Sequence, residues 1–127
     1  MSSESTDRTL TQNDQIGLRT VIRIMDKWGL DTACQAQLIH VDSETLSSPQ
    51  SLPCFNNEQR SRVSYLLNIH ASLRDLFQNP ENQYGFMSAV NHNPPFYGQS
   101  PLDLILSGEP SALKEVFYHL ERVKYGQ

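Results

Sequence analysis

The stretch FYGQSPLDLILSGEP, residues 96–110, sets two helix starts close together near the end of the chain. Ser100 followed by Pro101 is typical of an N-cap and a first helical residue, because the missing proline N–H has no intrahelical partner to lose. Asp103 stands where its carboxylate can reach the cap and meet the positive end of the helix dipole. Gly108 is typical of the left-handed residue that ends a helix, and EPS then begins another. The stretch predicts rigid backbone geometry and supplies no reactive group.

Helical spacing continues toward the N-terminus. Thr11 is predicted to cap a helix that Gly29 closes. Its apolar residues recur at steps of three and four, at Leu18, Val21, Ile22, Met25 and Trp28. Asp31 is predicted to cap a short helix over 31–41. Residues 42–58 hold serines and prolines without sustained periodicity, which predicts mostly loop.

Helical spacing also dominates the second half. A long helix is predicted over 57–77, and Asn79-Pro80 repeats the cap-plus-proline pattern before a helix with one apolar side of Tyr84, Met87 and Val90. Two prolines and Gly98 predict a structured turn over 91–99. Short and long helices follow over 101–107 and 111–124, the last with a stripe of Leu113, Val116, Phe117, Leu120 and Val123. No segment alternates at period two, so we expect an all-α fold of about seven helices.

Length and charge bound the class of protein. A chain of 127 residues can bury one ordinary core, or two small helical units that share one. The net charge of −4 comes entirely from residues 1–59, since acidic and basic residues balance in the second half. No stretch approaches the ~20 apolar residues of a membrane span, and the first residues lack a basic, apolar leader. We therefore expect a cytoplasmic protein without membrane attachment.

Motifs for catalysis are absent from the sequence. It contains no phosphate-binding glycine loop, nucleophile elbow or HExxH pattern. Cys34 and Cys54 form no CxxC pair, so partly buried thiols are expected and no metal site. The histidines are scattered, and His70 falls on the apolar side of the central helix, where a hydrogen-bonded core histidine is the simplest interpretation. We expect no catalytic residue, no cofactor and no enzyme activity.

A helix-turn-helix outline lies between Trp28 and Ser48. Ser43 would then cap the reading helix, and Ser43 and Thr45 would contact DNA. Pro49 leaves that helix only about five residues, or ~7.5 Å. Between Lys27 and Arg60 there is no Lys or Arg, whereas neutralising phosphates needs such groups. The sequence therefore predicts weak DNA binding by this element.

The C-terminal third resembles the toxin-binding domain of the Xre/MbcA/ParS antitoxins. The matching residues are Asn91, Phe96, Gly98, Ser100, Pro101, Leu102, Asp103, Leu104, Gly108, Leu113, Val116, Leu120 and Gly126. The family's linking helix is similar through Arg62, Leu66, Ile69, His70, Leu73, Leu76 and Phe77. Residues 9–48 more loosely resemble its Xre-like half. Two departures are Gln99, where an arginine is usual, and Phe86, where a tryptophan is common.

This resemblance implies a division of the chain and a function. A disordered N-terminus over 1–8 would precede a degenerate Xre-like helix-turn-helix domain over 9–55, with the linking helix and toxin-binding domain over 56–127. The protein would be the antitoxin of a type II pair and a homodimer. Its C-terminal part would cover the active site of a toxin, most often a RES-domain enzyme that consumes NAD. A DNA-binding transcriptional regulator and an enzyme remain the alternatives.

The expected binding face follows from the same residues. The predicted toxin contacts are Phe96, Tyr97, Gln99, Ser100, Tyr118, Arg122 and Tyr125, because tyrosine and arginine are common interface anchors. Residues with a structural role in the block are expected to be Asn91, Gly98, Pro101, Asp103 and Gly108. A simpler interpretation holds beside this one, in which the apolar stripes merely pack a helical hairpin.

Overall fold

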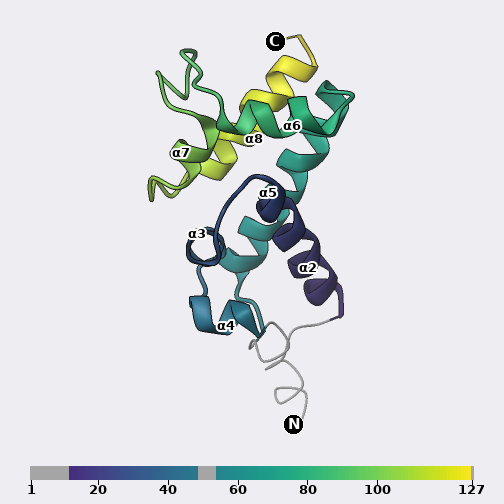
Figure 1. Cartoon of the computed structure of the whole chain (residues 1–127), viewed down its shortest axis with the longest axis vertical. Helices are drawn as coiled ribbons and strands as arrows, with labels where there is room; N and C mark the ends of the chain where they lie inside the picture. The colour runs from purple at the N-terminus through teal and green to yellow at the C-terminus, as the bar shows by residue number, and fades with distance from the viewer. Residues whose placement is uncertain (1–11, 49–53, 127) are drawn as a thin grey trace. The chain divides into compact units, whose positions relative to one another are not determined.

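The computed structural model describes residues 12–48 and 54–126, which form seven helices and no strand (Figure 1). The predicted all-α class is confirmed. The helices are α2 Gln12–Lys27, α3 Thr32–Ile39, α4 Ser43–Ser47, α5 Asn57–Leu76, α6 Pro80–Ser88, α7 Pro101–Ile105 and α8 Ala112–Lys124. The predicted disordered N-terminus and the cap at Thr11 lie outside the described residues. Within those residues, no helix has the length and apolarity needed to cross a bilayer.

Two compact units make up the chain, one up to Ser64 and one from Tyr65. Their boundary falls inside α5. The first turns of α5 bind helices of the N-terminal unit. Arg60 forms an ion pair with Asp14 of α2 at 3.0 Å, and Arg62 donates to the Leu38 carbonyl of α3. The linking helix is thus shared between the units.

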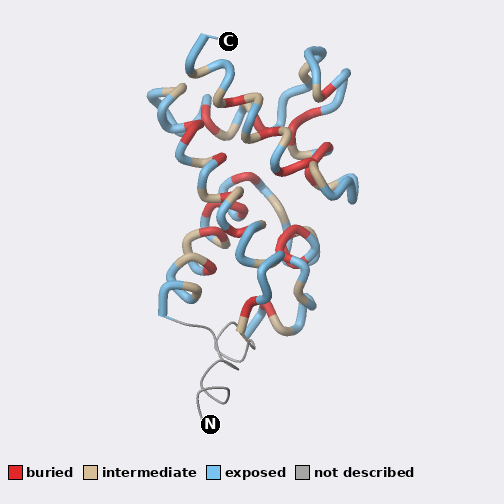
Figure 2. Tube along the Cα trace, turned by 180° about the vertical axis from the view of Figure 1, so that it is seen from behind, coloured by how far each residue is buried: buried red, intermediate tan, exposed pale blue. Residues whose placement is uncertain are grey.

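The N-terminal unit buries one face of each helix. Along α2 the buried residues are Leu18, Val21, Ile24 and Met25, and Trp28 after the helix is buried too. The helical spacing predicted these except Ile24, and the predicted Ile22 is only half-buried. Ala36, Leu38 and Ile39 of α3 are buried as well. Figure 2 shows buried positions recurring along the helices between exposed ones. Gly29 ends α2 with a φ of 85°, and the Asp31 carboxylate caps α3 by accepting from the Cys34 N–H at 2.9 Å. Both predicted helix ends are confirmed.

A short helix interrupts the segment predicted to be mostly loop. α4 covers only Ser43–Ser47, which agrees with the estimate of about five residues for a reading helix. Its N-cap residue is Asp42 and not Ser43, and Asp42 makes no side-chain capping hydrogen bond. Ser43 is instead the first helical residue, and its carbonyl accepts from the Ser47 hydroxyl at 3.1 Å.

The C-terminal unit combines the rest of α5 with α6, α7 and α8, and α7 contacts both α6 and α8. Its core residues include Leu66, Ile69, Leu73, Met87, Phe96, Ile105, Leu113, Val116 and Leu120. Two stripe predictions are wrong. Val90 is 58% exposed because α6 ends at Ser88, before that residue, and Val123 is 51% exposed on the last turn of α8.

Candidate protein-binding site

The turn between α6 and α7 is built from backbone hydrogen bonds. The Asn91 N–H donates to the Gln99 carbonyl at 3.0 Å, and the Gly98 N–H donates to the Asn91 carbonyl at 2.8 Å. The Asn91 side chain also accepts from the Asn93 N–H at 2.9 Å. Gly98 adopts a φ of 96°, which suits glycine because it has no Cβ to clash. Asn91 and Gly98 thus hold the backbone of the turn, and the turn presents Tyr97 and Gln99 as exposed side chains.

The helix start after this turn has the predicted geometry. The Ser100 hydroxyl accepts from the Asp103 N–H at 3.0 Å, and Pro101 is buried at the first helical position of α7. Gly108 has a φ of 91°, but α7 ends at Ile105 with Leu106 as its C-cap, so the helix stops before the glycine that was predicted to end it. Ser100 itself is buried. Its predicted place on the exposed binding face is therefore corrected, because its hydroxyl is used for capping.

Phe96 also departs from the predicted surface. It is fully buried, and its ring meets His119 of α8 edge to face with ring centroids 4.9 Å apart. Phe86 lies 6.2 Å from both rings and 6.0 Å from Phe77. We call Phe77, Phe86, Phe96 and His119 the aromatic cluster, and it holds the turn against α8.

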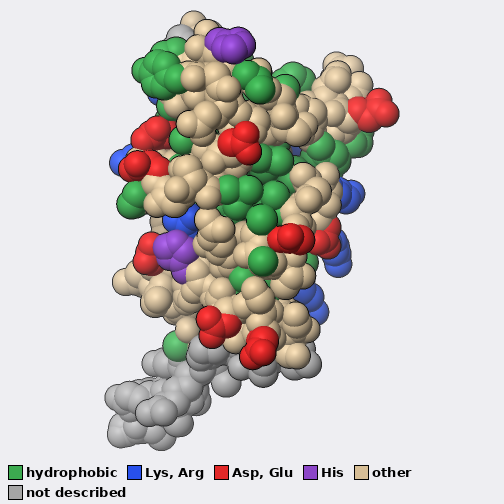
Figure 3. Space-filling model, turned by 60° about the vertical axis from the view of Figure 1, so that its left-hand side comes forward, with side chains coloured by type: hydrophobic (Ala, Val, Ile, Leu, Met, Phe, Trp, Pro, Cys, Tyr) green, Lys and Arg blue, Asp and Glu red, His purple; other side chains and the backbone are tan. Residues whose placement is uncertain are grey.

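The solvent face of α8 carries the remaining predicted contacts. Tyr118 is 45% exposed, Tyr125 is 68% exposed, and Arg122 is exposed between them. The two tyrosines are seven residues apart, which on an α-helix puts them on one face about 10.5 Å from each other. Lys114 lies one turn before Tyr118, with its ammonium 5.8 Å from the ring centroid. We call Lys114, Tyr118, Arg122 and Tyr125 the α8 face. Elsewhere too, hydrophobic side chains reach the molecular surface, among acidic and polar ones (Figure 3).

A polar network fixes the end of α8 that carries Tyr125. Buried Ser72 of α5 donates to a Glu121 carboxylate oxygen at 2.8 Å. Lys124 binds the same oxygen at 2.9 Å and Asp75 of α5 at 3.1 Å. Hydrogen bonds from Lys124 and Ser72 lower the pKa of Glu121, and the two carboxylates raise the pKa of Lys124. The α8 face is therefore displayed on a helix that is tied to α5 by the neighbouring residues Glu121 and Lys124.

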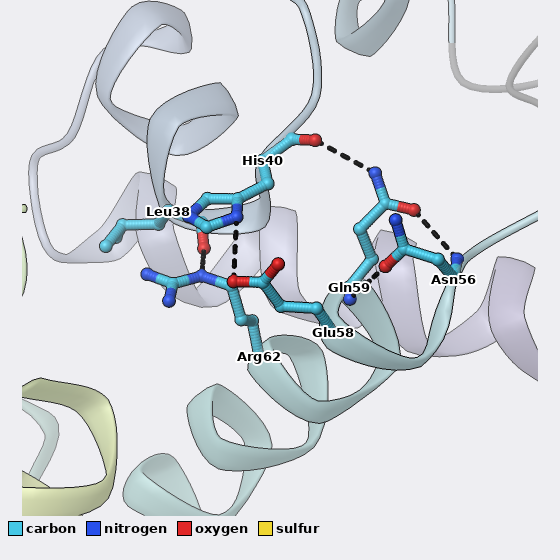
Figure 4. Close-up of polar contacts among 6 residues, drawn as sticks. All are labelled: Leu38, His40, Asn56, Glu58, Gln59 and Arg62. Carbon is cyan, nitrogen blue, oxygen red and sulfur yellow. Dashed lines mark hydrogen bonds and ion pairs between the residues drawn. The ribbon is translucent and has the colours of Figure 1, made fainter. Parts of the chain in front are cut away.

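The predicted DNA contacts lie in the N-terminal unit. Ser43 is exposed and Thr45 is half-buried, both on α4. The turn before α4 depends on His40, which adopts the left-handed conformation with a φ of 66°. α5 supports this turn through Gln59, which donates to the His40 carbonyl at 2.9 Å, and through Glu58, which lies 3.2 Å from the imidazole (Figure 4).

In the described part of the N-terminal unit, the basic side chains belong to α2 and α5, and α4 has none. Arg60 is paired with Asp14, and burial lowers the pKa of Arg62, whose guanidinium binds the Leu38 carbonyl. The exposed basic side chains of α2 are Arg19, Arg23 and Lys27, spaced one helical turn apart. Positive charge thus lines α2, whereas α4 has acidic Asp42 and Glu44 at its start.

Cysteine and histidine side chains are dispersed. Cys34 and Cys54 are both unpaired in disulfides and half-buried, as predicted, and a hydrogen bond to Asp31 raises the pKa of the Cys34 thiol. His70 is half-buried and stacks on Tyr84 with ring centroids 6.4 Å apart. Across residues 12–48 and 54–126, no three His, Cys, Asp or Glu side chains are grouped so that they could hold a metal ion.

Comparison with known proteins adds no relative. No protein-family model matches the chain, and a search of curated proteins finds no match either. The resemblance to the antitoxin family therefore rests on the residues of the sequence itself and stays a prediction.

Sequence reasoning missed the residues that position the site. His119 was one of four scattered histidines, and Ser72 and Glu121 were not singled out. The hydrogen bond between Ser72 and Glu121 joins residues 49 positions apart. One available signal was the placement of His119 on α8 beside Leu120, next to the core stripe.

Proposed function

We propose that this protein is an antitoxin that binds a toxin enzyme and occludes its active site, without catalysis or a cofactor of its own. The observation that carries the proposal is the α8 face, where Tyr118, Arg122 and Tyr125 stand exposed on one side of a helix. Tyrosine and arginine dominate binding hot spots, and amphipathic helices commonly dock in grooves. The proposed partner is the RES-domain, NAD-consuming enzyme that the sequence resemblance implies.

Preorganisation of this face supports the proposal. Ser72, Asp75 and Lys124 hold the last turns of α8, while the aromatic cluster holds the turn that presents Tyr97 and Gln99. A side chain that is already positioned loses less conformational entropy when a partner binds. The α8 face is thus suited to fill the active-site cleft of a toxin.

We also propose that the antitoxin acts as a homodimer, since this is the commonest assembly of soluble oligomers.

Co-expression with the neighbouring gene product tests the function. We expect that product to deplete cellular NAD and stop growth when it is expressed alone. Co-expression of this protein should restore both the NAD level and growth. A neighbouring product that is harmless alone, or that stays toxic in the presence of this protein, contradicts the proposal.

Substitution of Tyr125 tests the binding face. Tyr125→Ala is expected to weaken toxin binding by about 2 kcal/mol, or roughly thirtyfold in Kd, as for a hot-spot residue. Its folding stability should change by less than about 0.5 kcal/mol because the side chain is largely exposed. Ile16→Ala on α2 is the matched control, since Ile16 is 51% exposed in the other unit. Equal binding by both variants, measured by calorimetry, would remove the α8 face from the interface.

A DNA-binding regulator is the second candidate, favoured by the arrangement of α3, the His40 turn and α4. Five residues of α4 span only ~7.5 Å, and guanine edges are best read by Arg or Lys, which α4 lacks. We expect a gel shift on the protein's own promoter to be weak at physiological salt. Any binding that occurs should be lost when Arg19, Arg23 and Lys27 are all changed to Gln, because phosphate contacts need cations. Tight, sequence-specific binding by the triple variant would favour the regulator.

A further inference from the structure

His119 occupies the place where the Asn91–Gln99 turn meets α8. Its ring contacts Phe96 of the turn at 4.9 Å between centroids and stacks on Phe86 of α6 at 6.2 Å. The backbone of Pro94 in the turn also acts on this imidazole and raises its pKa. One side chain of α8 therefore holds the turn by its ring contacts.

The surroundings of this imidazole favour its neutral form. The elements packed against it present uncharged groups, namely Phe86 from α6 and Phe96 with the Pro94 backbone from the turn. Arg122, one turn further along α8, is the charged group that acts on it, and it repels a second cation. Burial and Arg122 lower the pKa of His119, while the Pro94 backbone opposes them more weakly.

Other titratable groups near this contact are engaged or lie elsewhere. At the end of α5, Asp75 is bound by Lys124. One turn back on α8, the Glu115 carboxylate accepts from the Ser111 hydroxyl at 2.6 Å. His92, the second histidine in this region, is exposed and lies near Gly98. Protonation of His119 thus places a positive charge beside apolar rings and the Arg122 guanidinium.

We propose that His119 is a proton-sensitive latch, which holds the Asn91–Gln99 turn on α8 when neutral and releases it when protonated. Proton linkage gives the direction of the pH dependence. Because the pKa of His119 is lower while the turn is docked, His119 binds more protons when the turn is free, and acid therefore favours release. The docked turn is fully favoured above 6.5, the ordinary pKa of histidine, and the preference is lost as pH falls below it. Release would withdraw Tyr97 and Gln99 from their fixed positions, and only this consequence for toxin binding rests on the proposed function.

Nuclear magnetic resonance of the full chain tests the latch without any toxin. The His119 imidazole and the backbone amides of the turn are followed from about pH 7.5 to about pH 5. We expect His119 to titrate below free histidine, and the Gly98 amide, which donates to Asn91, to lose hydrogen-exchange protection with the same midpoint. A midpoint above that of free histidine would show that the rings stabilise the cation and would overturn the proposal.

Two variants separate the latch from ordinary packing. His119→Gln keeps a hydrogen-bond donor but cannot gain a proton, so Gly98 protection should change by less than about twofold over the same range after correction for intrinsic exchange. His92→Gln is the matched control and should respond to acid as the original chain does. An acid response that survives in His119→Gln contradicts the latch, and if that variant fails to fold at neutral pH, the direct titration of the unaltered chain still decides. Toxin binding measured at both pH values then tests the consequence separately, because the latch can hold even if no toxin binds.

Discussion

The two units of the chain use their polar and aromatic residues differently. In the N-terminal unit, polar groups join the helices. Arg60 binds Asp14, Gln59 binds the His40 carbonyl, and buried Gln35 donates to Asp26 at 2.6 Å. In the C-terminal unit, aromatic rings join the turn to α8, and further aromatic side chains remain outside. The large hydrophobic side chains exposed there are Val90, Tyr97, Tyr118, Val123 and Tyr125, against Ile16 alone among the described residues of the N-terminal unit.

This difference in exposed hydrophobic side chains indicates where a protein partner would bind. Exposed aromatic groups give a folded monomer no burial energy, yet they contribute strongly to an interface. The N-terminal unit instead exposes separated charges, which at the surface contribute little to affinity. The comparison therefore favours the C-terminal unit as the binding unit, and substitutions in three places, the turn at Phe96 and Tyr97, Ser72 and His40, test the structural basis of that division.

The largest effect is expected where the aromatic residues of the turn divide between core and surface. Phe96→Ala removes a fully buried ring from the aromatic cluster and should cost about 3–5 kcal/mol of folding free energy. Tyr97→Ala, at the next position and 75% exposed, should change stability by less than about 0.5 kcal/mol. Chemical denaturation measures both. Similar losses for the two variants would break the distinction between a core residue and an interface residue in this turn.

A smaller effect is expected for the polar network of the C-terminal unit. Ser72→Ala should cost about 1 kcal/mol, since it removes a hydrogen bond made by a buried hydroxyl. The folded chain lowers the pKa of Glu121, so this group stabilises the fold above its ordinary pKa of 4.5, and that stabilisation is lost as pH falls. Ser72→Ala should weaken this dependence because the hydroxyl helps to lower the pKa. Thermal unfolding at a series of pH values checks the result, and an unchanged pH profile would assign the pKa shift to Lys124 alone.

An effect of similar size is expected at the His40 turn of the N-terminal unit. The left-handed conformation costs a residue other than glycine about 1 kcal/mol of conformational free energy, and His40 adopts it. His40→Gly should therefore be more stable than His40→Ala by roughly that amount, since both lose the exposed pair with Glu58 and only glycine relieves the backbone. Denaturation of the two variants gives the difference directly. Alanine equal to or better than glycine would show that the turn does not retain this conformation.

Local chemistry allowed the sequence to determine the helix boundaries. Ser100, Asn79 and Asp31 cap helices as predicted, and Gly29 and Gly108 take positive φ after helix ends. Such features depend on residues within one turn of each other, so they can be identified without the fold. Tyr118, Arg122 and Tyr125 were placed correctly on the exposed side of α8 by the same helical period.

Only the tertiary structure decided which side chains those helices leave free. Phe96 and Ser100 lie in a turn whose composition suggests exposure, yet α8 covers the first and the cap of α7 uses the second. The bond between Ser72 and Glu121 and the contact between Phe96 and His119 join distant parts of the chain. Burial depends on every element that packs around a residue, and a local pattern records only its own helix. For this reason the sequence determined the helices and their ends, while long-range packing selected the side chains that are displayed on the surface.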